Sequence, residues 1–185
     1  MKIEEAITVQ NDPEAVWELF QDVPELARCL PGAELTEDKG GGVFAGQLVA
    51  KLGPMTAKFE GEATVVSNHE NRTGTVDGTG TDRAGGSVGQ VKMTYAINPR
   101  DGGGTVIEVD ADVILSGAAA QFGRTGLIKE MSRRLIDEFV QCIEAKLAAE
   151  SREEATAVRA GDVKGISLFF ASLWGWFKGL FRSSK

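Results

Sequence analysis

Alternating apolar and polar positions run through most of the chain and predict a series of β-strands. In the stretch 55–66, Ala57, Phe59 and Gly61 share one face, while Lys58 and Glu60 share the other. This period of two is typical of an antiparallel sheet with one dry and one solvated side. The same kind of pattern predicts strands at 3–9, 34–37, 43–52, 55–66, 72–81, 87–97 and 105–115.

Helices are predicted at both ends of this strand series. Asp12 can cap a helix over 13–20, because its side chain can accept a backbone N–H bond and Pro13 suits the first helical position. A second short helix is predicted over 24–30. Near the end of the strand series the apolar period becomes 3.6, which predicts a long amphipathic helix over about 124–150. Strands followed by one helix indicate an α+β fold with the helix on one face of the sheet.

The inner face of the predicted sheet carries many small residues. They are Gly46, Ala57, Gly61, Ala63, Gly74, Gly78, Gly89 and Ala111. Small residues there indicate either close packing of the helix or an unfilled cavity, and periodicity alone leaves both open.

The last segment has another pattern. On a helix, residues 163–182 place aromatic and aliphatic side chains on one side, with basic residues, Ser and Gly largely on the other. Rings and basic groups together favour a lipid headgroup boundary, whereas a protein groove is the alternative. The uncharged run between Lys164 and Lys178 covers 165–177, fewer than the roughly 20 residues needed to span a bilayer. The candidate membrane-binding residues are Lys164, Phe169, Phe170, Leu173, Trp174, Trp176, Phe177, Lys178, Leu180, Phe181 and Arg182.

Charge separates this tail from the body. The net charge is −7, and the tail from 163 to 185 contributes +4, which leaves −11 for residues 1–162. An acidic body argues against nucleic acid as a partner, because the phosphate backbone requires clustered Lys and Arg. We therefore expect three parts: a folded domain at 1–148, a linker at 149–162 and the tail at 163–185.

Few residues suggest chemistry. His69 is the only histidine and lies in a polar turn, no spacing suits a metal, and we predict no catalytic residue. Cys29 and Cys142 form no CxxC motif, and we interpret them as reduced thiols of a cytosolic protein. A nucleophilic pair of either cysteine with His69 is a weak alternative. The start of the chain shows no secretory signal, so we expect a cytoplasmic location.

Several motifs in order resemble a known family. They are Asp12-Pro13 with Trp17 and Leu19, Leu30-Pro31-Gly32-Ala33, Gly53-Pro54-Met55 with Phe59 and Gly61, Gly85-Gly86 with Gly89, and the run GAAAQFGR at 117–124. Residues 1 to about 148 thereby resemble the carbon monoxide dehydrogenase CoxG family of the START-like SRPBCC superfamily. The resemblance implies a helix-grip fold, in which a curved antiparallel sheet wraps a C-terminal helix around a hydrophobic pocket. It also implies a non-catalytic accessory protein of a molybdenum-containing carbon monoxide dehydrogenase or a related molybdenum hydroxylase.

Together these observations predict a carrier and tether at the cytoplasmic face of the membrane. The pocket would hold a lipid or a quinone such as menaquinone, with no covalently bound cofactor. The candidate wall residues, each of which could equally be ordinary core, are Phe20, Leu48, Phe59, Met93, Tyr95, Val109, Phe122, Ile128, Met131 and Leu135. Two alternatives stay open: a cyclase-like or hydrolase-like enzyme with polar groups in its pocket, and a purely structural membrane adaptor.

Overall fold

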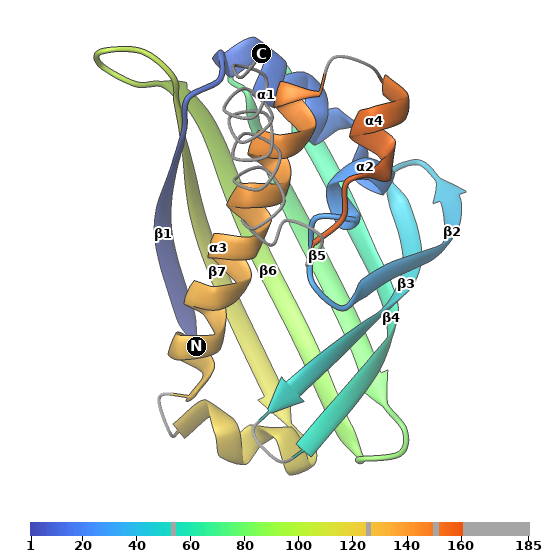
Figure 1. Ribbon diagram of the computed structural model, residues 1–185. Coiled ribbons are helices and arrows are strands. Elements are labelled where there is room, and N and C mark those ends of the chain that lie inside the picture. The colour runs from blue at the N-terminus through green and yellow to red at the C-terminus, as the bar shows by residue number, and fades with distance from the viewer. Residues whose placement is uncertain (53–54, 125–126, 150–151, 161–185) are drawn as a thin grey trace, which may run out of the picture.

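A seven-stranded antiparallel sheet forms one curved wall of the protein in the order β1-β7-β6-β5-β4-β3-β2 (Figure 1). The computed structural model describes residues 1–52, 55–124, 127–149 and 152–160, with the side chains of 52, 55, 122–132 and 152–153 excluded. The strands are β1 (Lys2–Val9), β2 (Ala33–Gly40), β3 (Val43–Leu52), β4 (Met55–Asn68), β5 (Thr73–Asp82), β6 (Ser87–Pro99) and β7 (Thr105–Ser116). The strands from β2 to β6 each pair with the next strand in the sequence. Strand β1 pairs with β7 and forms one edge of the sheet.

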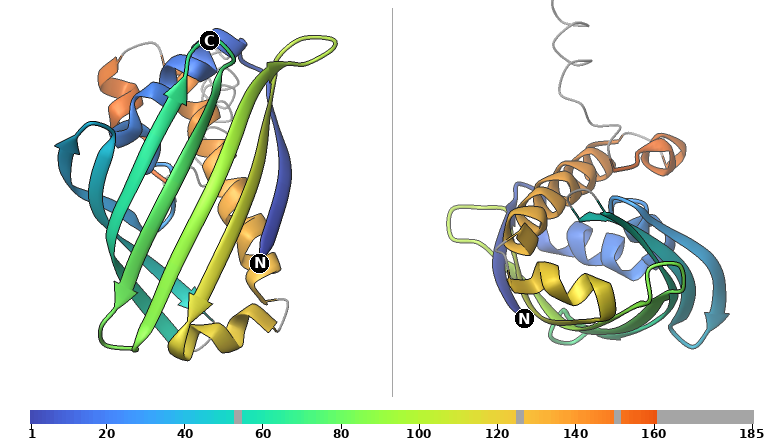
Figure 2. Two further views of the ribbon diagram at one scale, coloured as in Figure 1. Left: turned by 180° about the vertical axis from the view of Figure 1, so that it is seen from behind. Right: turned by 90° about the horizontal axis from the view of Figure 1, so that it is seen from below.

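The helices lie on the concave side of this sheet. They are α1 (Pro13–Gln21), α2 (Val23–Ala27), the 3-10 helix η1 (Gly117–Arg124), α3 (Leu127–Ala148) and α4 (Arg152–Ala157). Seen from below in Figure 2, the sheet curves around α1, α2 and η1, and α3 runs across the open side. The helix-grip α+β fold predicted from the sequence is therefore confirmed. The predicted long helix is α3, and the separate element η1 precedes it.

Local sequence explains where the first helices begin. Asp12 has an extended backbone and its Oδ1 accepts from the Glu14 N–H at 2.9 Å, so it caps α1 as predicted. Asp22 caps α2 in the same way, because its Oδ1 accepts from the Glu25 N–H at 3.1 Å. The two helices thus follow each other almost without a connecting segment.

The packed core occupies the end of the sheet that carries α1 and α2. It contains Ile7, Val9, Val16, Trp17, Phe20, Cys29, Tyr95, Ile97, Ile107, Cys142 and Ile143. A much smaller cluster, Ala57 and Ala119, with Ala50, Phe59 and Leu115 against it, occupies the end near η1. Among the described side chains, the large buried ones therefore gather at one end of the inner face.

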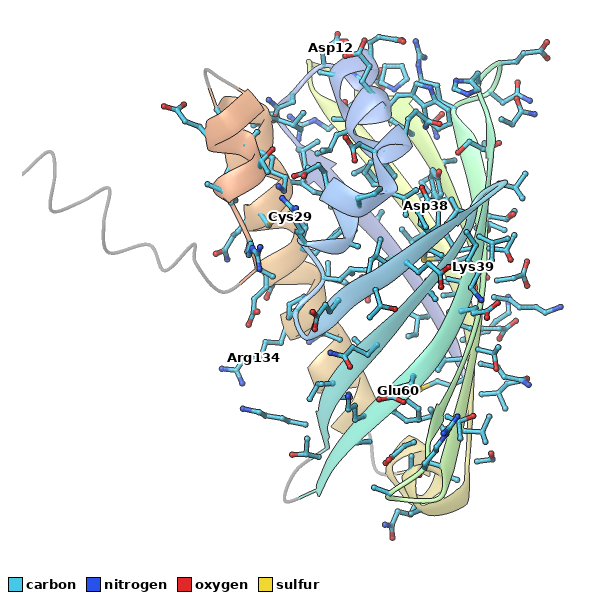
Figure 3. All side chains as sticks on the ribbon, turned by 90° about the vertical axis from the view of Figure 1, so that its right-hand side faces the viewer. Asp12, Cys29, Asp38, Lys39, Glu60 and Arg134 are labelled. Atoms are coloured by element: carbon cyan, nitrogen blue, oxygen red, sulfur yellow. A yellow bond between two sulfur atoms is a disulfide. The ribbon has the colours of Figure 1, made fainter. Side chains whose placement is uncertain are left out.

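The two cysteines form a disulfide, and the prediction of reduced thiols was wrong. Cys29 follows α2 and Cys142 lies in α3, 113 residues apart in sequence, yet their Cα atoms are 5.4 Å apart. Figure 3 shows Cys29 where the N-terminal helices face α3. Sequence spacing could not reveal this pair, because only the packing of α2 on α3 brings the residues together. The nucleophilic alternative with His69 is wrong too, since both sulfur atoms are bonded.

An ion network beside the disulfide holds α2, α3 and α4 together. The Lys146 side chain is buried, and its Nζ donates to Glu25 Oε2 at 2.8 Å and to the Ala155 carbonyl at 2.7 Å. Glu25 also pairs with Arg28 at 2.9 Å, and Arg28 donates to the Thr156 carbonyl at 3.0 Å. Residues 152–160 of the predicted linker are thus packed on the body, while its role as a connection to the tail stays a prediction.

Candidate functional site

A cavity of about 420 Å³ opens on the concave face of the sheet, between the packed core and the η1 end. Strands β1 to β7 contribute to its wall, together with the end of α2 and Leu135 of α3. Its large apolar lining residues are Met1, Ile3, Leu30, Leu35, Phe44, Leu48, Phe59, Val91, Val113, Leu115 and Leu135. The size lies within the roughly 300–1,000 Å³ that is usual for small-molecule sites.

A row of glycines forms the floor of the cavity. Gly46 of β3 pairs with Gly61 of β4, which pairs with Gly80 of β5, which pairs with Gly89 of β6. Four adjacent strands therefore present no side chain along one line of the inner face. The missing side chains leave the space that the cavity occupies.

The glycine row also brings strands unusually close. A Cβ atom on Gly61 would lie 1.9 Å from the Thr79 carbonyl oxygen, so only glycine fits there. A Cβ atom on Gly89 would make ordinary contacts at 3.5 Å with Leu115 Cδ2 and Phe59 Cε1. Gly61 is thus required by backbone packing in the sheet, whereas Gly89 borders open space and the Phe59 ring.

The described side chains that face the cavity are apolar. Glu34 and Glu62 border it, but each occupies an exposed strand position that alternates with inward residues. Glu34 Oε2 accepts from Gln47 Nε2 at 2.6 Å, and Glu62 Oε1 accepts from Lys39 Nζ at 2.5 Å. The hydrogen bond from Lys39 to Glu62 raises the pKa of Lys39. The carboxylates of Glu34 and Glu62 are therefore engaged on the outer face and do not point into the cavity.

Buried polar groups at the η1 end are engaged in local structure. Asp82 is buried, and its Oδ1 accepts the N–H groups of Ala84 and Gly85 at 3.1 and 3.0 Å. Ser87 Oγ accepts the Ala119 N–H at 3.0 Å. Asp82 therefore stabilises the β5–β6 turn, and Ser87 anchors η1 to the sheet.

The single histidine also has a structural partner. His69 lies in the turn between β4 and β5, as predicted, and its Nδ1 accepts from Trp17 Nε1 at 3.3 Å. The two rings meet edge to face at 5.3 Å between centroids. Within the described residues, no group of His, Cys, Asp and Glu is arranged to hold a metal ion.

The structure separates the ten predicted wall residues into groups. Leu48, Phe59 and Leu135 line the cavity. Phe20 and Tyr95 are instead packed core, with their ring centroids 5.2 Å apart. Tyr95 also fills the space over Gly74, where an added Cβ would meet its ring at 2.3 Å.

The remaining wall predictions have other positions. Met93 lies on the inner face between Val76 and Ala111 in the sheet register, outside the cavity lining. Val109 packs against the core. The side chains of Phe122, Ile128 and Met131 lie outside the described part, as do all the tail residues predicted to bind a membrane. No helix in the described ranges is long and apolar enough to cross a bilayer.

The ten predicted wall residues left out many lining residues, among them the strand residues Ile3, Leu35, Phe44, Val91, Val113 and Leu115. Leu30 and Met1 lie outside the strands, so no strand period could assign them to an inner face. Gly80 was also missed, although it alternates in step with Gly74 and Gly78, and this period could have revealed it. The cavity wall therefore includes residues that only the chain path brings to it.

A larger hollow, of about 750 Å³, lies on the outer face of the sheet near the core end. It is bordered by exposed residues such as Glu4, Val66 and Thr94, and by Glu108 and Asp110. Because it lies open to solvent between charged side chains, we regard the smaller apolar cavity as the candidate ligand site.

The sequence of the folded domain matches a known protein family. The CoxG family, named for the G subunit of carbon monoxide dehydrogenase, matches residues 6–148. The chain belongs to the CoxG family. The match covers the whole sheet from Ala6 onward, η1 and α3, and so includes nearly all of the cavity wall. No sequence among the curated proteins matches the chain significantly.

Solved structures show the same fold at low sequence identity. A conserved protein from Geobacillus kaustophilus matches with a TM-score of 0.68 and 16% identity, over 80% of this chain and 95% of that one. The Zhui aromatase/cyclase from Streptomyces sp. R1128 matches with a TM-score of 0.55 and 15% identity, over 80% and 93%. A truncated norcoclaurine synthase from Thalictrum flavum matches with a TM-score of 0.50 and 18% identity, over 82% and 95%. At these identities the likeness concerns the fold alone.

Proposed function

We propose that this CoxG-family protein carries a hydrophobic ligand, such as the quinone menaquinone, and links a molybdenum-containing carbon monoxide dehydrogenase to the cytoplasmic membrane. The ligand occupies the cavity over the glycine row. The tail at 163–185 binds the membrane surface, and the body presents the ligand to the dehydrogenase. The observation that carries the proposal is an open cavity whose described inward side chains are apolar.

The lining favours a lipid-like ligand over a charged one. A charged ligand would lose its hydration in the cavity and find no ionic partner among the described inward side chains. An apolar ligand instead gains about 25 cal/mol for each Å² of apolar surface removed from water. A quinone with an isoprenoid chain meets this requirement along nearly its whole length.

The same lining supports a carrier rather than an enzyme. General acid–base catalysis requires a titratable side chain within hydrogen-bond reach of the substrate. Among the described residues, Glu34 and Glu62 bond to outer-face partners, and Asp82 is engaged in a turn. The likeness to a cyclase and a synthase therefore concerns the fold of this chain and does not supply a catalytic mechanism for it.

Calorimetric titration of the full-length protein with a short-chain menaquinone tests ligand binding. Gly89→Val places three carbon atoms over the cavity floor, and we expect affinity to fall roughly tenfold or more, equivalent to about 1.4 kcal/mol. Ala96→Val is the matched control, since Ala96 lies on the opposite face of the same strand. Equal affinities for the two variants, or no binding to the parent protein, would refute the proposed ligand site.

Flotation with vesicles that contain phosphatidylglycerol tests the membrane link. Each basic residue near an anionic surface contributes about 1 kcal/mol, so Lys178→Gln is expected to weaken binding about fivefold. Lys92→Gln removes the same charge from an exposed position on the sheet and is expected to leave binding unchanged. Purified carbon monoxide dehydrogenase should then float only when the full-length protein is present.

A further inference from the structure

The wall of the cavity includes two parts of the chain that are far apart in sequence. Ala27, Leu30 and Ala33, at and just after the end of α2, line the cavity, and so does Leu135 of α3. Leu30 is 44% exposed and Leu135 is 40% exposed, so both lie where the cavity opens to solvent. The strength of the attachment between these two parts therefore affects how widely the cavity is open.

The Cys29–Cys142 disulfide joins these two parts close to the cavity. Cys29 directly precedes Leu30, and Cys142 lies about two helical turns after Leu135 in α3. The Lys146–Glu25 ion pair also joins α3 to α2, about one further turn away from the cavity. If the disulfide breaks, this ion pair still holds the far side, and the side that borders the cavity is released.

The segment after Cys29 is also attached to the sheet. The N–H of Val49 in β3 donates to the Gly32 carbonyl at 2.9 Å. Ala33 starts β2 and pairs with Leu48 of β3. A segment released from α3 therefore stays attached to β3, so the expected change is a local displacement of the cavity wall and not unfolding of the domain.

Packing determines which part moves when the disulfide is reduced. Two thiols need more room than two bonded sulfur atoms, because unbonded atoms stay at van der Waals distance. Cys29 and Cys142 are both fully buried, and a close-packed interior transmits such a displacement to its neighbours. On the α3 side, Phe139 and Ile143 pack in the core. On the other side, Leu30 borders open space, so we expect the Leu30 side to move.

We infer that the Cys29–Cys142 disulfide is a redox switch of the cavity. The bonded form holds the Leu30 segment against α3 and retains an apolar ligand, whereas the reduced form opens this side and binds the ligand more weakly. The role of the switch in the cell rests on the ligand and the cytoplasmic location of the proposed function. Disulfides of cytoplasmic proteins are usually transient and redox-sensing, because cellular dithiols of the thioredoxin type reduce them.

A dithiol reductant is sufficient for the chemical step. One of its thiolates attacks Cys29 Sγ, the bond between the sulfur atoms breaks, and Cys142 leaves as a thiolate that takes up a proton. The second thiol of the reductant then displaces Cys29 as a thiol, and the reductant becomes a disulfide. Two electrons and two protons thus pass to the protein. Because both sulfur atoms are buried, the Leu30 segment must separate from α3 before the attack.

Hydrogen exchange of the full-length protein, bonded or reduced with excess dithiothreitol, tests the opening. The N–H groups of Cys29, Leu30 and Ala33 donate to backbone carbonyls at 3.0 to 3.1 Å, so their exchange reports on this segment. We expect exchange there to be about fivefold or more faster after reduction, while Ile97 in the core stays slow. Equal exchange of the segment in both forms would overturn the inference. Faster exchange at Ile97 would also overturn it, because the domain would then unfold as a whole.

Two controls separate reduction of the disulfide from other effects of dithiothreitol. Cys29→Ala with Cys142→Ala contains no thiol, so dithiothreitol should leave the exchange of its Leu30 amide unchanged. Oxidised dithiothreitol added to the native protein serves the same purpose without any substitution. Faster exchange at Leu30 in either control would show that the effect does not come from the disulfide, and would overturn the inference.

Ligand affinity separates this inference from the proposed function. The probe is the dimethyl ether of a short-chain menaquinol, which thiols do not reduce, and it is titrated under nitrogen after dithiothreitol is removed. We expect the reduced form to bind about fivefold more weakly. By linkage, bound probe should lower the reduction potential of the disulfide by about 20 mV, since a tenfold change corresponds to about 30 mV.

The outcomes of the two experiments differ for the two proposals. Faster exchange at Leu30, combined with no binding of the probe to either form, would support the redox-controlled opening and refute the proposed ligand. Equal affinity of the bonded and reduced forms would refute the switch and leave the proposed ligand standing. Tighter binding to the reduced form would refute the switch as well.

Discussion

Individual glycines have different roles on the inner face of this sheet. Gly61 meets the backbone of β5 so closely that no side chain fits, whereas Gly89 borders the cavity. Gly74 is a third case, since the buried Tyr95 ring covers it. Glycine thus permits close strand packing at position 61, open space at position 89 and the packing of an aromatic ring at position 74.

This difference predicts a large effect on stability for one alanine substitution and a small effect for the other. Gly61→Ala forces the backbone of β4 away from β5, and we expect a loss of about 1–3 kcal/mol or more in the free energy of unfolding. Gly89→Ala adds a methyl group at ordinary contact distance, and we expect a change within about 0.5 kcal/mol. Urea denaturation of the two variants measures both. Equal losses would show that the close approach at Gly61 is not present in solution.

At the scale of elements, the helices form a connected group that spans α2, α3 and α4. The Cys29–Cys142 disulfide and the buried Lys146 lie one helical turn apart along α3. Lys146 carries charge in a buried position, which is tolerated only because Glu25 and the Ala155 carbonyl satisfy it. This group holds the position from which the tail leaves the body.

The disulfide should contribute measurably to stability. It closes a loop of 113 residues, and removal with Cys29→Ala and Cys142→Ala is expected to cost about 2–5 kcal/mol in the free energy of unfolding. Urea denaturation with and without reductant checks this, and the double variant should not respond to reductant. Alkylation after denaturation provides a direct control, because two free thiols in the native protein would contradict the disulfide.

At the scale of the whole molecule, packing is uneven along the sheet. Among the described side chains, the large buried cluster lies at the end with α1 and α2, and a small one lies at the η1 end. The cavity lies between them, and its mouth is bordered by exposed apolar residues. Because the cavity interrupts the packing, local openings are expected to be more frequent around it than in the core.

Hydrogen exchange should reveal this gradient. We expect the amides of Ile97 and Ile107, in the core, to exchange most slowly and those of Gly80 and Gly89, beside the cavity, to exchange faster. A bound menaquinone should slow exchange around Gly80 and Gly89 more than around Ile97. Mass spectrometry of peptides from the full-length protein measures both effects. A uniform change along the sheet would contradict a ligand seated over the glycine row.

The sequence by itself determined the elements and the faces of the sheet. The period of two placed Phe59, Tyr95 and Ile107 on the inner side, and Asp12 with Pro13 marked the start of α1, because these signals are local. The order of strands and helices then led to the helix-grip fold. The amphipathic tail was likewise defined by sequence, and its role stays a prediction.

Only the tertiary structure decided which inner-face residues are core and which border a cavity. Phe20 and Tyr95 belong to the core because α1 packs onto β6, while Leu30 reaches the cavity through the chain path after α2. The Cys29–Cys142 bond has the same origin, since a contact across 113 residues leaves no periodic trace in the chain. Periodicity reports which way a side chain faces, and packing between distant segments determines what it meets there.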